Sequence, residues 1–185
     1  MARAGITWCA SVLILCGATS ASAIDAPGVF PDGTDTFTMS LNYQGERKGL
    51  DRSVSSVSVG REHYFIDNGA LGLQLLGYYT HDDEDGVGIG GNGYGRYHFF
   101  TRQHFSIYGD VLGGVFVGTQ DFPTGGTALN FTYAGGPGVS LEIDERTHLM
   151  MGVRFQHVSN GFISGRDRNP IFNSFGGYVG LMWER

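Results

Sequence analysis

Long segments of this chain alternate apolar and polar residues, and this period of two constrains the fold more than any other feature. Residues 36–43 read Thr-Phe-Thr-Met-Ser-Leu-Asn-Tyr, in which every second side chain is apolar. Residues 104–117, 129–143 and 147–155 repeat the pattern. Successive side chains of a β-strand point to opposite faces, so each segment predicts a strand with one apolar and one polar face.

Four further segments complete a set of eight predicted strands, at residues 53–65, 70–80, 87–100 and 171–183. Most of the eight exceed the length of strands in soluble proteins and reach the roughly 9 to 11 residues that cross a bilayer at a tilt. A chain with 31 Gly, 13 Phe and 9 Tyr is also rich in residues of β structure and turns. We therefore predict an all-β fold, an eight-stranded antiparallel transmembrane β-barrel, because closed bacterial barrels have an even number of strands.

The polar faces of these strands carry charges, namely Arg96, Asp110, Glu142 and Arg154. Such charges are costly in an apolar core, but inside a small membrane barrel they can pair with one another. A soluble barrel of the lipocalin type is the alternative fold, and it would turn the apolar faces inward around a ligand. The charges on the opposite faces argue against that alternative.

The predicted connections alternate in length. Long or strongly polar ones span residues 44–52, 81–86, 118–128 and 160–170, and short ones span 67–69, 101–103 and 144–146. Membrane barrels have long extracellular loops and short periplasmic turns. This pattern predicts that both termini lie in the periplasm and that the connection after the seventh strand lies outside the cell.

Residues 1–23 are predicted to be a secretory signal peptide, because Arg3 is followed by an apolar run and by Ala21-Ser22-Ala23. A lipoprotein signal at Cys16 is a minor alternative, since Leu15 is larger than the residue such a signal needs. Residues 24–185 then form one outer-membrane barrel domain of a Gram-negative cell, without cysteines. Losing Arg3 leaves 11 Lys and Arg against 18 Asp and Glu, a net charge of −7, which disfavours nucleic acid as a partner.

Three other motifs lack the context of a functional site. Gly88-Ile89-Gly90-Gly91-Asn92-Gly93 has the spacing of a dinucleotide loop but no following helix. The acidic residues 81–86 lack the ligand spacing of an EF-hand. The histidines without a close His or Cys partner are His63, His98, His104 and His148. We predict neither a metal site nor another cofactor.

The segment that departs from the alternation is at the end of the seventh strand. His157 and Ser159 share the apolar, lipid-facing side with Phe155, and hairpin pairing brings Asn173 of the last strand beside them. Polar groups facing hydrocarbon are costly unless they serve a function. They mark either the polar rim of the barrel or a nucleophile and base that act on a membrane lipid.

His157-Val158-Ser159-Asn160-Gly161, followed by Asn169-Pro170-Ile171-Phe172-Asn173, resembles the signature of the PagL family of outer-membrane lipid A 3-O-deacylases. The family has a signal peptide, a barrel of this size and a His-x-Ser-Asn motif on the seventh strand. The resemblance implies a serine esterase that removes the 3-linked hydroxyacyl chain of lipid A in the outer leaflet. It implies His157 as general base and Ser159 as nucleophile.

The same resemblance assigns Asn169 and the backbone near Gly161 to oxyanion stabilisation, and Asn160 either to that role or to holding the loop. In the family a glutamate orients the histidine, whereas this sequence has Asn173 there. Asparagine accepts a hydrogen bond from imidazole but supplies no negative charge. Asp167, in the following loop, is a candidate substitute acid.

Lipid A or lipopolysaccharide is the implied partner, together with the outer membrane, and a homodimer is left open. Arg166 and Arg168 are candidate contacts of the lipid A phosphates, as are Arg47, Lys48 and Arg52 of another predicted outer loop. The alternative function is a noncatalytic barrel of the same fold that binds lipopolysaccharide or is structural, and Asn173 is the feature that favours it.

Overall fold

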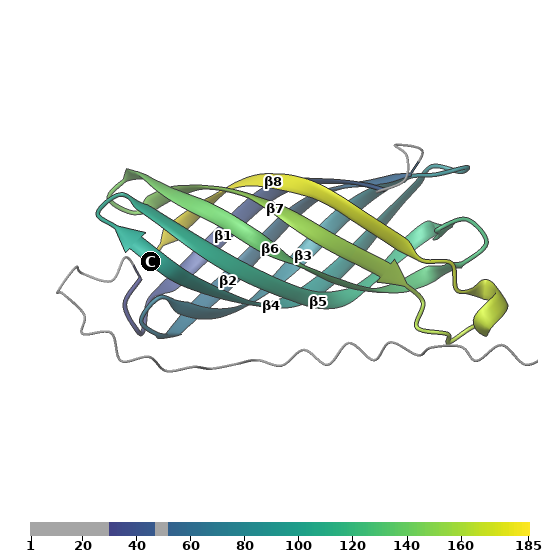
Figure 1. Ribbon diagram of the computed structural model, residues 1–185, viewed down its shortest axis with the longest axis horizontal. Helices are drawn as coiled ribbons and strands as arrows, with labels where there is room; N and C mark the ends of the chain where they lie inside the picture. Colours follow the sequence, from purple (N-terminus) through teal and green to yellow (C-terminus); the bar gives the residue numbers. More distant parts are fainter. Residues whose placement is uncertain (1–29, 47–51) are drawn as a thin grey trace, which may run out of the picture.

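The computed structural model is a closed barrel of eight antiparallel strands that follow one another in sequence order (Figure 1). It describes residues 30–46 and 52–185. The strands are β1 (Asp35–Glu46), β2 (Ser53–Ile66), β3 (Gly69–His81), β4 (Gly86–Arg102), β5 (Phe105–Phe122), β6 (Thr127–Asp144), β7 (Thr147–Ser159) and β8 (Phe172–Glu184). The predicted eight-stranded fold is confirmed. The predicted signal peptide, both cysteines, Arg47 and Lys48 lie outside the described residues.

Pairing of β1 with β8 closes the barrel, with Phe37 opposite Trp183 and Leu41 opposite Val179. Every other strand pairs with its neighbour in the chain. A three-residue 3₁₀ helix, η1 (Arg166–Arg168), interrupts the connection from β7 to β8. The described residues contain no helix of the length and apolarity that a membrane-spanning helix needs.

The longest strands differ from the prediction. Residues 118–128 were expected to be a loop, but β5 continues to Phe122 and β6 begins at Thr127. The extension carries exposed polar residues such as Thr119, Gln120 and Asp121. A paired strand that continues into water needs no apolar face, so the alternation ends before the strand does. The long connection 160–171 still follows β7, at the end of the barrel opposite the C-terminus (Figure 1).

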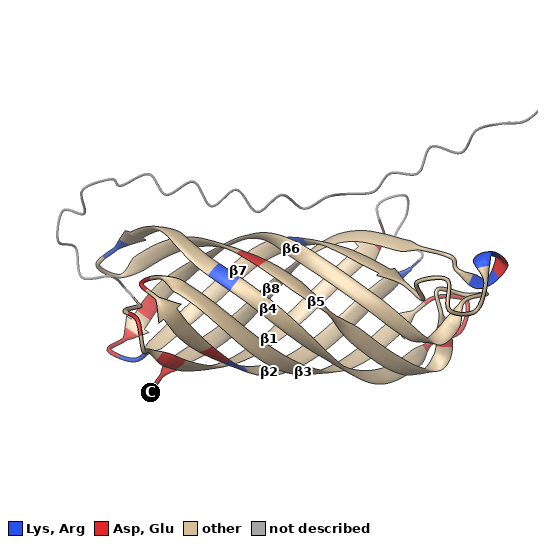
Figure 2. Cartoon of the chain, turned by 90° about the horizontal axis from the view of Figure 1, so that it is seen from below, with Lys and Arg blue, Asp and Glu red and all other residues tan. Residues whose placement is uncertain are grey.

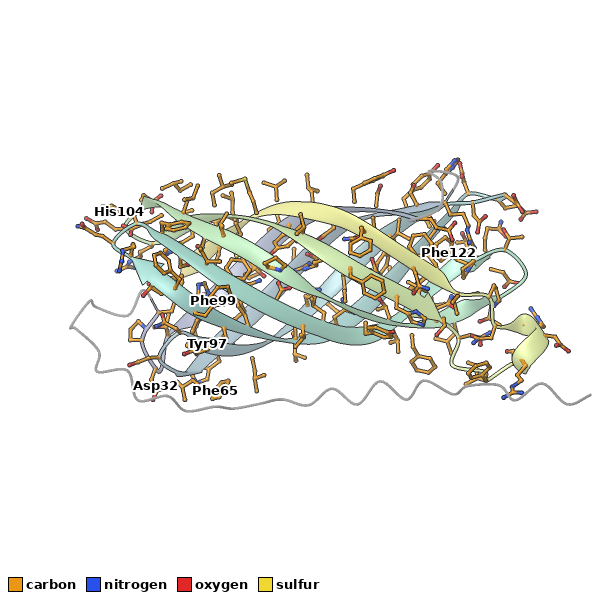
Figure 3. The ribbon with its side chains drawn as sticks, in the orientation of Figure 1. Asp32, Phe65, Tyr97, Phe99, His104 and Phe122 are labelled. Atoms are coloured by element: carbon orange, nitrogen blue, oxygen red, sulfur yellow. The ribbon has the colours of Figure 1, made fainter. Side chains whose placement is uncertain are left out.

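The apolar side chains of the strands face outward, as a membrane barrel requires and a lipocalin-like barrel does not. Leu73 and Ile89 are 73% and 74% exposed, and Leu41, Val111 and Val153 are also exposed. Figure 3 shows side chains projecting from the barrel along its whole length, with Phe65, Tyr97 and Phe99 near the end that carries Asp32 and His104. Aromatic residues at that level match the girdle that membrane barrels place at an interface.

A chain of buried ion pairs crosses the interior. Arg96 Nη1 lies 2.6 Å from Glu62 Oε1, and Arg96 Nη2 lies 3.5 Å from Asp110 Oδ2. Arg154 Nη2 lies 2.6 Å from the same Asp110 oxygen. Two cations and two anions thus balance one another, and Figure 2 shows charged positions within the strands as well as at the two ends.

The predicted pairing of interior charges is confirmed for Arg96, Asp110 and Arg154, but the prediction for Glu142 is wrong. Glu142 lies near the short turn after β6, where its carboxylate is 3.3 Å from the exposed His104 imidazole. Near a strand end the polar face meets water, so a charge there needs no interior partner. Glu62 was missed, although it is fully buried and anchors one end of the chain of ion pairs.

Apolar clusters fill the barrel on either side of these charges. The cluster nearer the short turns contains Phe30, Tyr64, Ala70, Tyr108, Met150, Tyr178 and Met182. The cluster nearer the long connections contains Val54, Leu76, Tyr78, Phe116, Phe122, Val158 and Phe172. The interior of this small barrel is therefore packed with side chains, as expected for eight strands.

Candidate active site

Three neighbouring strands bring the predicted catalytic residues together on the outer wall. In the strand register His157 of β7 lies opposite Asn173 of β8 on one side and Tyr133 of β6 on the other. Ser159 is the last residue of β7 and lies opposite Phe131. All of these positions belong to the outward-facing set, because they share the parity of the exposed Val153. The site lies where β7 leaves the barrel wall and enters the long connection.

His157 links the serine to the asparagine through its two ring nitrogens. Its Nε2 lies 3.1 Å from Ser159 Oγ, and its Nδ1 lies 2.7 Å from Asn173 Oδ1. An amide oxygen only accepts hydrogen bonds, so Nδ1 of a neutral imidazole carries the proton and donates it to Asn173. Nε2 then has a lone pair directed at the Ser159 hydroxyl. A serine, a base and an orienting group in this order form the arrangement that activates a nucleophile.

An aromatic ring fixes the third side of the imidazole. The ring of Tyr133 stacks on His157 with centroids 4.6 Å apart and an angle of 20° between the planes. Sequence reasoning treated Tyr133 only as an outward-facing apolar residue. The signal that identifies it is cross-strand pairing, since residues directly opposite on one face of a sheet contact each other.

A tight turn follows Ser159. Gly161 and Phe162 both have left-handed backbone conformations, with φ of 63° and 65°, and Ile163 N donates to Asn160 O over 3.3 Å. Two successive positive φ values under such a hydrogen bond are typical of a type I′ turn. Gly161 suits this position because a Cβ there would lie 3.2 Å from the Phe131 ring. Phe162 has no such freedom, so its conformation is costly and is held by the surrounding loop.

Asn160 and Asn169 hold the two ends of the connection together. The Asn160 side chain is buried, donates through Nδ2 to Arg168 O and accepts from Phe162 N over 3.0 Å. Its backbone N donates to Asn169 Oδ1 over 2.9 Å. The contacts of the Asn160 side chain are thus those of a residue that holds the loop. Asn169 accepts through its oxygen, which leaves its Nδ2 amino group to donate elsewhere.

The remaining predicted residues lie in η1 and are exposed. Arg168 turns toward the hairpin of β5 and β6, where its Nη2 donates to Gly126 O over 2.9 Å and lies 3.3 Å from Asp121. Within the part of the chain that is described, Arg166 and Asp167 make no side-chain hydrogen bond or ion pair. Asp167 therefore does not reach His157, whose Nδ1 is already bonded to Asn173.

In residues 30–46 and 52–185, no three His, Cys, Asp or Glu side chains are grouped closely enough to hold a metal ion. The hydrogen bonds of the site join the Ser159 hydroxyl to the His157 imidazole. Asn169 is hydrogen-bonded to the backbone of Asn160, the residue that follows the serine.

The family model described as "Lipid A 3-O-deacylase (PagL)" matches residues 52–182. A comparison with curated protein sequences finds no match. Among solved structures, the Neisserial surface protein A is 13% identical with a TM-score of 0.59, covering 82% of this chain and 97% of that one. The outer membrane enzyme PagL is 15% identical with a TM-score of 0.59, covering 77% and 97%. The outer membrane protein OprG from Pseudomonas aeruginosa is 12% identical with a TM-score of 0.55, covering 84% and 98%.

Proposed function

Because the chain belongs to the PagL family of lipid A 3-O-deacylases, we propose that it is an outer-membrane serine esterase that hydrolyses the 3-linked hydroxyacyl ester of lipid A. The outer-membrane barrels among the similar structures indicate the same membrane. Reaching it requires export, for which residues 1–23 are the proposed signal peptide. The barrel then presents its long connections to the outside of the cell.

The observation that carries this proposal is the hydrogen-bonded sequence Ser159, His157, Asn173 on the lipid-facing wall. The two distances, 3.1 Å and 2.7 Å, are within hydrogen-bonding range. A polar group on such a wall is costly, so three that converge there need a purpose. A lipid ester approaching within the leaflet reaches this wall without leaving the membrane.

The proposed reaction begins with attack by Ser159. His157 Nε2 takes the hydroxyl proton while Oγ forms a bond to the ester carbonyl carbon, and the carbonyl electron pair moves to oxygen. Collapse of this tetrahedral intermediate breaks the bond to the sugar oxygen, which receives the proton from His157. Water then attacks the acyl-enzyme with His157 again as base, and a free hydroxy fatty acid leaves. Asn173 keeps the proton on Nδ1 throughout, so that Nε2 remains the base.

The developing oxyanion needs hydrogen-bond donors beside Ser159. We assign this role to the Gly161 backbone N–H and to Asn169 Nδ2. Two observations support the assignment. Gly161 has a left-handed backbone conformation in the turn after Ser159, and Asn160 N donates a hydrogen bond that holds the Asn169 side chain in place. Asn160 is a positioning residue in this scheme, because its own side chain bonds to the loop.

Arg166 is the proposed contact for a lipid A phosphate. It is exposed in η1, and its guanidinium is not engaged by a carboxylate of the described residues. Arg168 is also basic, but its contacts with Gly126 and Asp121 attach the last connection to the hairpin of β5 and β6. A phosphate at the loop would hold the sugar above the membrane surface while the acyl chain lies along β6 and β7.

The second candidate function is a noncatalytic barrel that binds lipopolysaccharide, and Asn173 favours it. An amide orients the imidazole but does not stabilise the imidazolium that forms during attack, and such a replacement costs about 10⁴ in rate in a serine protease. Both candidate functions are compatible with the same barrel fold. They differ in whether the bound lipid loses an acyl chain.

Mass spectrometry of lipid A from outer membranes that contain the wild type, Ser159→Ala or His157→Ala tests the proposal. We expect loss of one hydroxyacyl chain with the wild type and intact lipid A with both variants. Ser164→Ala, in the same connection but outside the hydrogen-bonded site, is the matched control and should retain activity. Intact lipid A with a correctly folded wild type would instead establish the noncatalytic candidate.

A further inference from the structure

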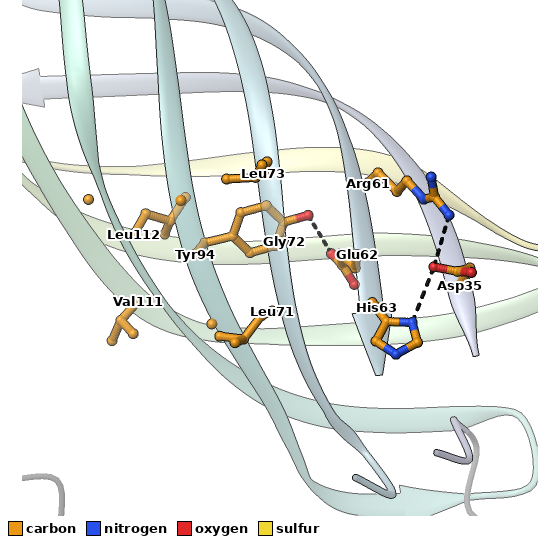
Figure 4. Close-up of a pocket in the computed structure, with 13 residues that line it drawn as sticks. Asp35, Arg61, Glu62, His63, Leu71, Gly72, Leu73, Tyr94, Val111 and Leu112 are labelled. Atoms are coloured by element: carbon orange, nitrogen blue, oxygen red, sulfur yellow. Dashed lines mark hydrogen bonds and ion pairs between the residues drawn. The ribbon is translucent and has the colours of Figure 1, made fainter. Parts of the chain in front are cut away.

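A furrow runs along the outer wall over β3, β4 and β5, away from the strands that carry His157. It has a volume of about 870 Å³, with Leu71, Leu73 and Val111 as its walls (Figure 4). Gly93, Gly95 and Gly113 form its floor. A second hollow of about 480 Å³ shares Leu71, Gly95 and Val111 and continues to Phe65 and Tyr97 at the short-turn end.

The glycines on this floor are not required by close packing of the backbone. A Cβ on Gly113 would have no atom within 4 Å, and the nearest atoms to a Cβ on Gly93 and Gly95 are leucine Cδ2 atoms at 3.8 and 3.6 Å. At Gly114, by contrast, a Cβ would lie 2.1 Å from a backbone oxygen. Glycine weakens a strand interior, so three positions that have room for a side chain but lack one point to a surface kept open for something else.

Charged groups stand at one end of the furrow, on a wall that is otherwise apolar. Asp35 Oδ1 lies 3.3 Å from Arg61 Nη2 and 3.3 Å from His63 Nδ1 (Figure 4). Arg61 and His63 are mostly exposed, with 67% and 58% of their side chains accessible. Charges on the lipid-facing side of a barrel are tolerated near the interface and costly at the midplane. Asp35 begins β1, so the cluster lies at the short-turn end, which faces the periplasm in bacterial barrels.

The cluster offers one guanidinium and one carboxylate side by side. Both contacts of Asp35 use Oδ1, so its Oδ2 is available to accept another hydrogen bond. The Arg61 guanidinium contributes one nitrogen to Asp35 and has further N–H groups that can bind a phosphate. This pairing of charges is complementary to a headgroup that itself carries one anion and one hydrogen-bonding cation.

We propose that the furrow is a binding site for a glycerophospholipid of the periplasmic leaflet whose headgroup has a phosphate and a primary ammonium. Arg61 binds the phosphate and Asp35 Oδ2 accepts from the ammonium. An acyl chain lies over Gly93, Gly95 and Gly113, between Leu71 and Leu73 on one side and Val111 on the other. A lipid with a quaternary ammonium has no N–H to donate to Asp35, and a lipid with a purely anionic headgroup offers no cation to Asp35 Oδ2.

The experiment uses the full barrel in nanodiscs of mixed phospholipids that contain a trace lipid with a photoreactive diazirine on its acyl chain. The probe is phosphatidylethanolamine, compared with phosphatidylcholine and phosphatidylglycerol bearing the same chain, and labelled peptides are identified by mass spectrometry. We expect labelling of residues 91–113 to be about two- to five-fold higher with phosphatidylethanolamine, the ratio that one exposed ion pair supplies.

Two sets of variants separate the headgroup from the chain. Gly113→Leu fills the floor and should abolish the excess labelling, whereas Gly77→Leu, which adds the same side chain on the outer face of β3 outside the furrow, should leave it unchanged. Asp35→Asn should remove the preference for phosphatidylethanolamine over phosphatidylcholine, and Arg61→Gln should lower labelling by both.

Equal labelling by all three lipids, or crosslinks between two copies of the chain at these residues, would overturn the proposal. Hydrolysis of lipid A is not part of the readout, so the result is independent of the proposed activity.

Discussion

At the scale of single residues, Asn173 bears most directly on the proposed role of His157 as a base. Its Oδ1 is 2.7 Å from His157 Nδ1 and holds the ring in the orientation that directs Nε2 at Ser159. Orientation and charge are separate contributions, and Asn173 supplies only the first. The proposed base thus has an oriented ring but no carboxylate beside its Nδ1.

Asn173→Asp separates the two contributions, because aspartate has the shape of asparagine and adds a negative charge at the same distance. We expect the single-turnover rate of lipid A deacylation to rise, by about 10² to 10⁴, since the carboxylate stabilises the imidazolium formed during attack. Asn173→Ala, which removes orientation as well, should lower the rate below that of the wild type. A rate for Asn173→Asp no higher than that of the wild type would mean that charge at this position does not limit the reaction.

The residues of the site were predicted to different degrees, and the strand register explains why. Asn173 was found because the β7 and β8 alternation puts it on the same face as His157. Tyr133 was not, because the alternation of residues 129–143 shows which side chains face outward but not which of them contacts the histidine. Pairing the last residue of that predicted strand with Thr147 places Tyr133 opposite His157, as in the structure. The register shift between Glu142 and Asp144 is confined to the turn and leaves that pairing unchanged.

At the scale of elements, the alternation of apolar and polar residues predicted the strand segments that have one lipid-facing side. It did not predict the strand ends that have no apolar side. All eight strands were found, but the ends of β5 and β6 were read as a loop because Gln120 and Asp121 have no apolar partners in the alternation. Those extensions have a use. The β5 extension carries the Asp121 carboxylate, and the turn between the two strands carries the Gly126 carbonyl; Arg168 of the last connection contacts both.

The two arginines of η1 should act differently, because one is bonded to the β5 and β6 hairpin and the other is not. Arg168→Ala releases the connection that carries Asn169, and we expect kcat to fall about tenfold for lipid A with or without its phosphates, since a slightly misplaced site loses much of its rate. Arg166→Glu should raise KM for phosphorylated lipid A alone. Asp121→Ala, which leaves the Arg168 bond to Gly126 intact, is the graded control. Steady-state kinetics on both lipids measures these effects, and equal behaviour of Arg166→Glu on the two would remove Arg166 from substrate binding.

At the scale of the whole molecule, stability and catalysis are assigned to opposite sides of the barrel wall. The interior holds Glu62, Arg96, Asp110 and Arg154 in a balanced chain of ion pairs, and the exterior holds the proposed nucleophile. Glu62 is fully buried and also accepts from Tyr94 over 2.8 Å. Removing its charge leaves two guanidinium groups to share the single carboxylate of Asp110. The predicted consequence is a loss of stability without a change in chemistry.

Glu62→Gln should lower the free energy of unfolding by about 3 to 5 kcal/mol, the cost of breaking a buried ion pair. Urea unfolding of the barrel in lipid vesicles measures this loss. Adding Arg96→Met to Glu62→Gln removes the uncompensated cation and should recover part of the stability. Because Arg154 is three residues from His157 on the same strand, the rate per folded molecule is the decisive control. If that rate falls together with stability in Glu62→Gln and returns in the double variant, the interior charges act on the site through β7, and the separation between the two faces of the wall is wrong.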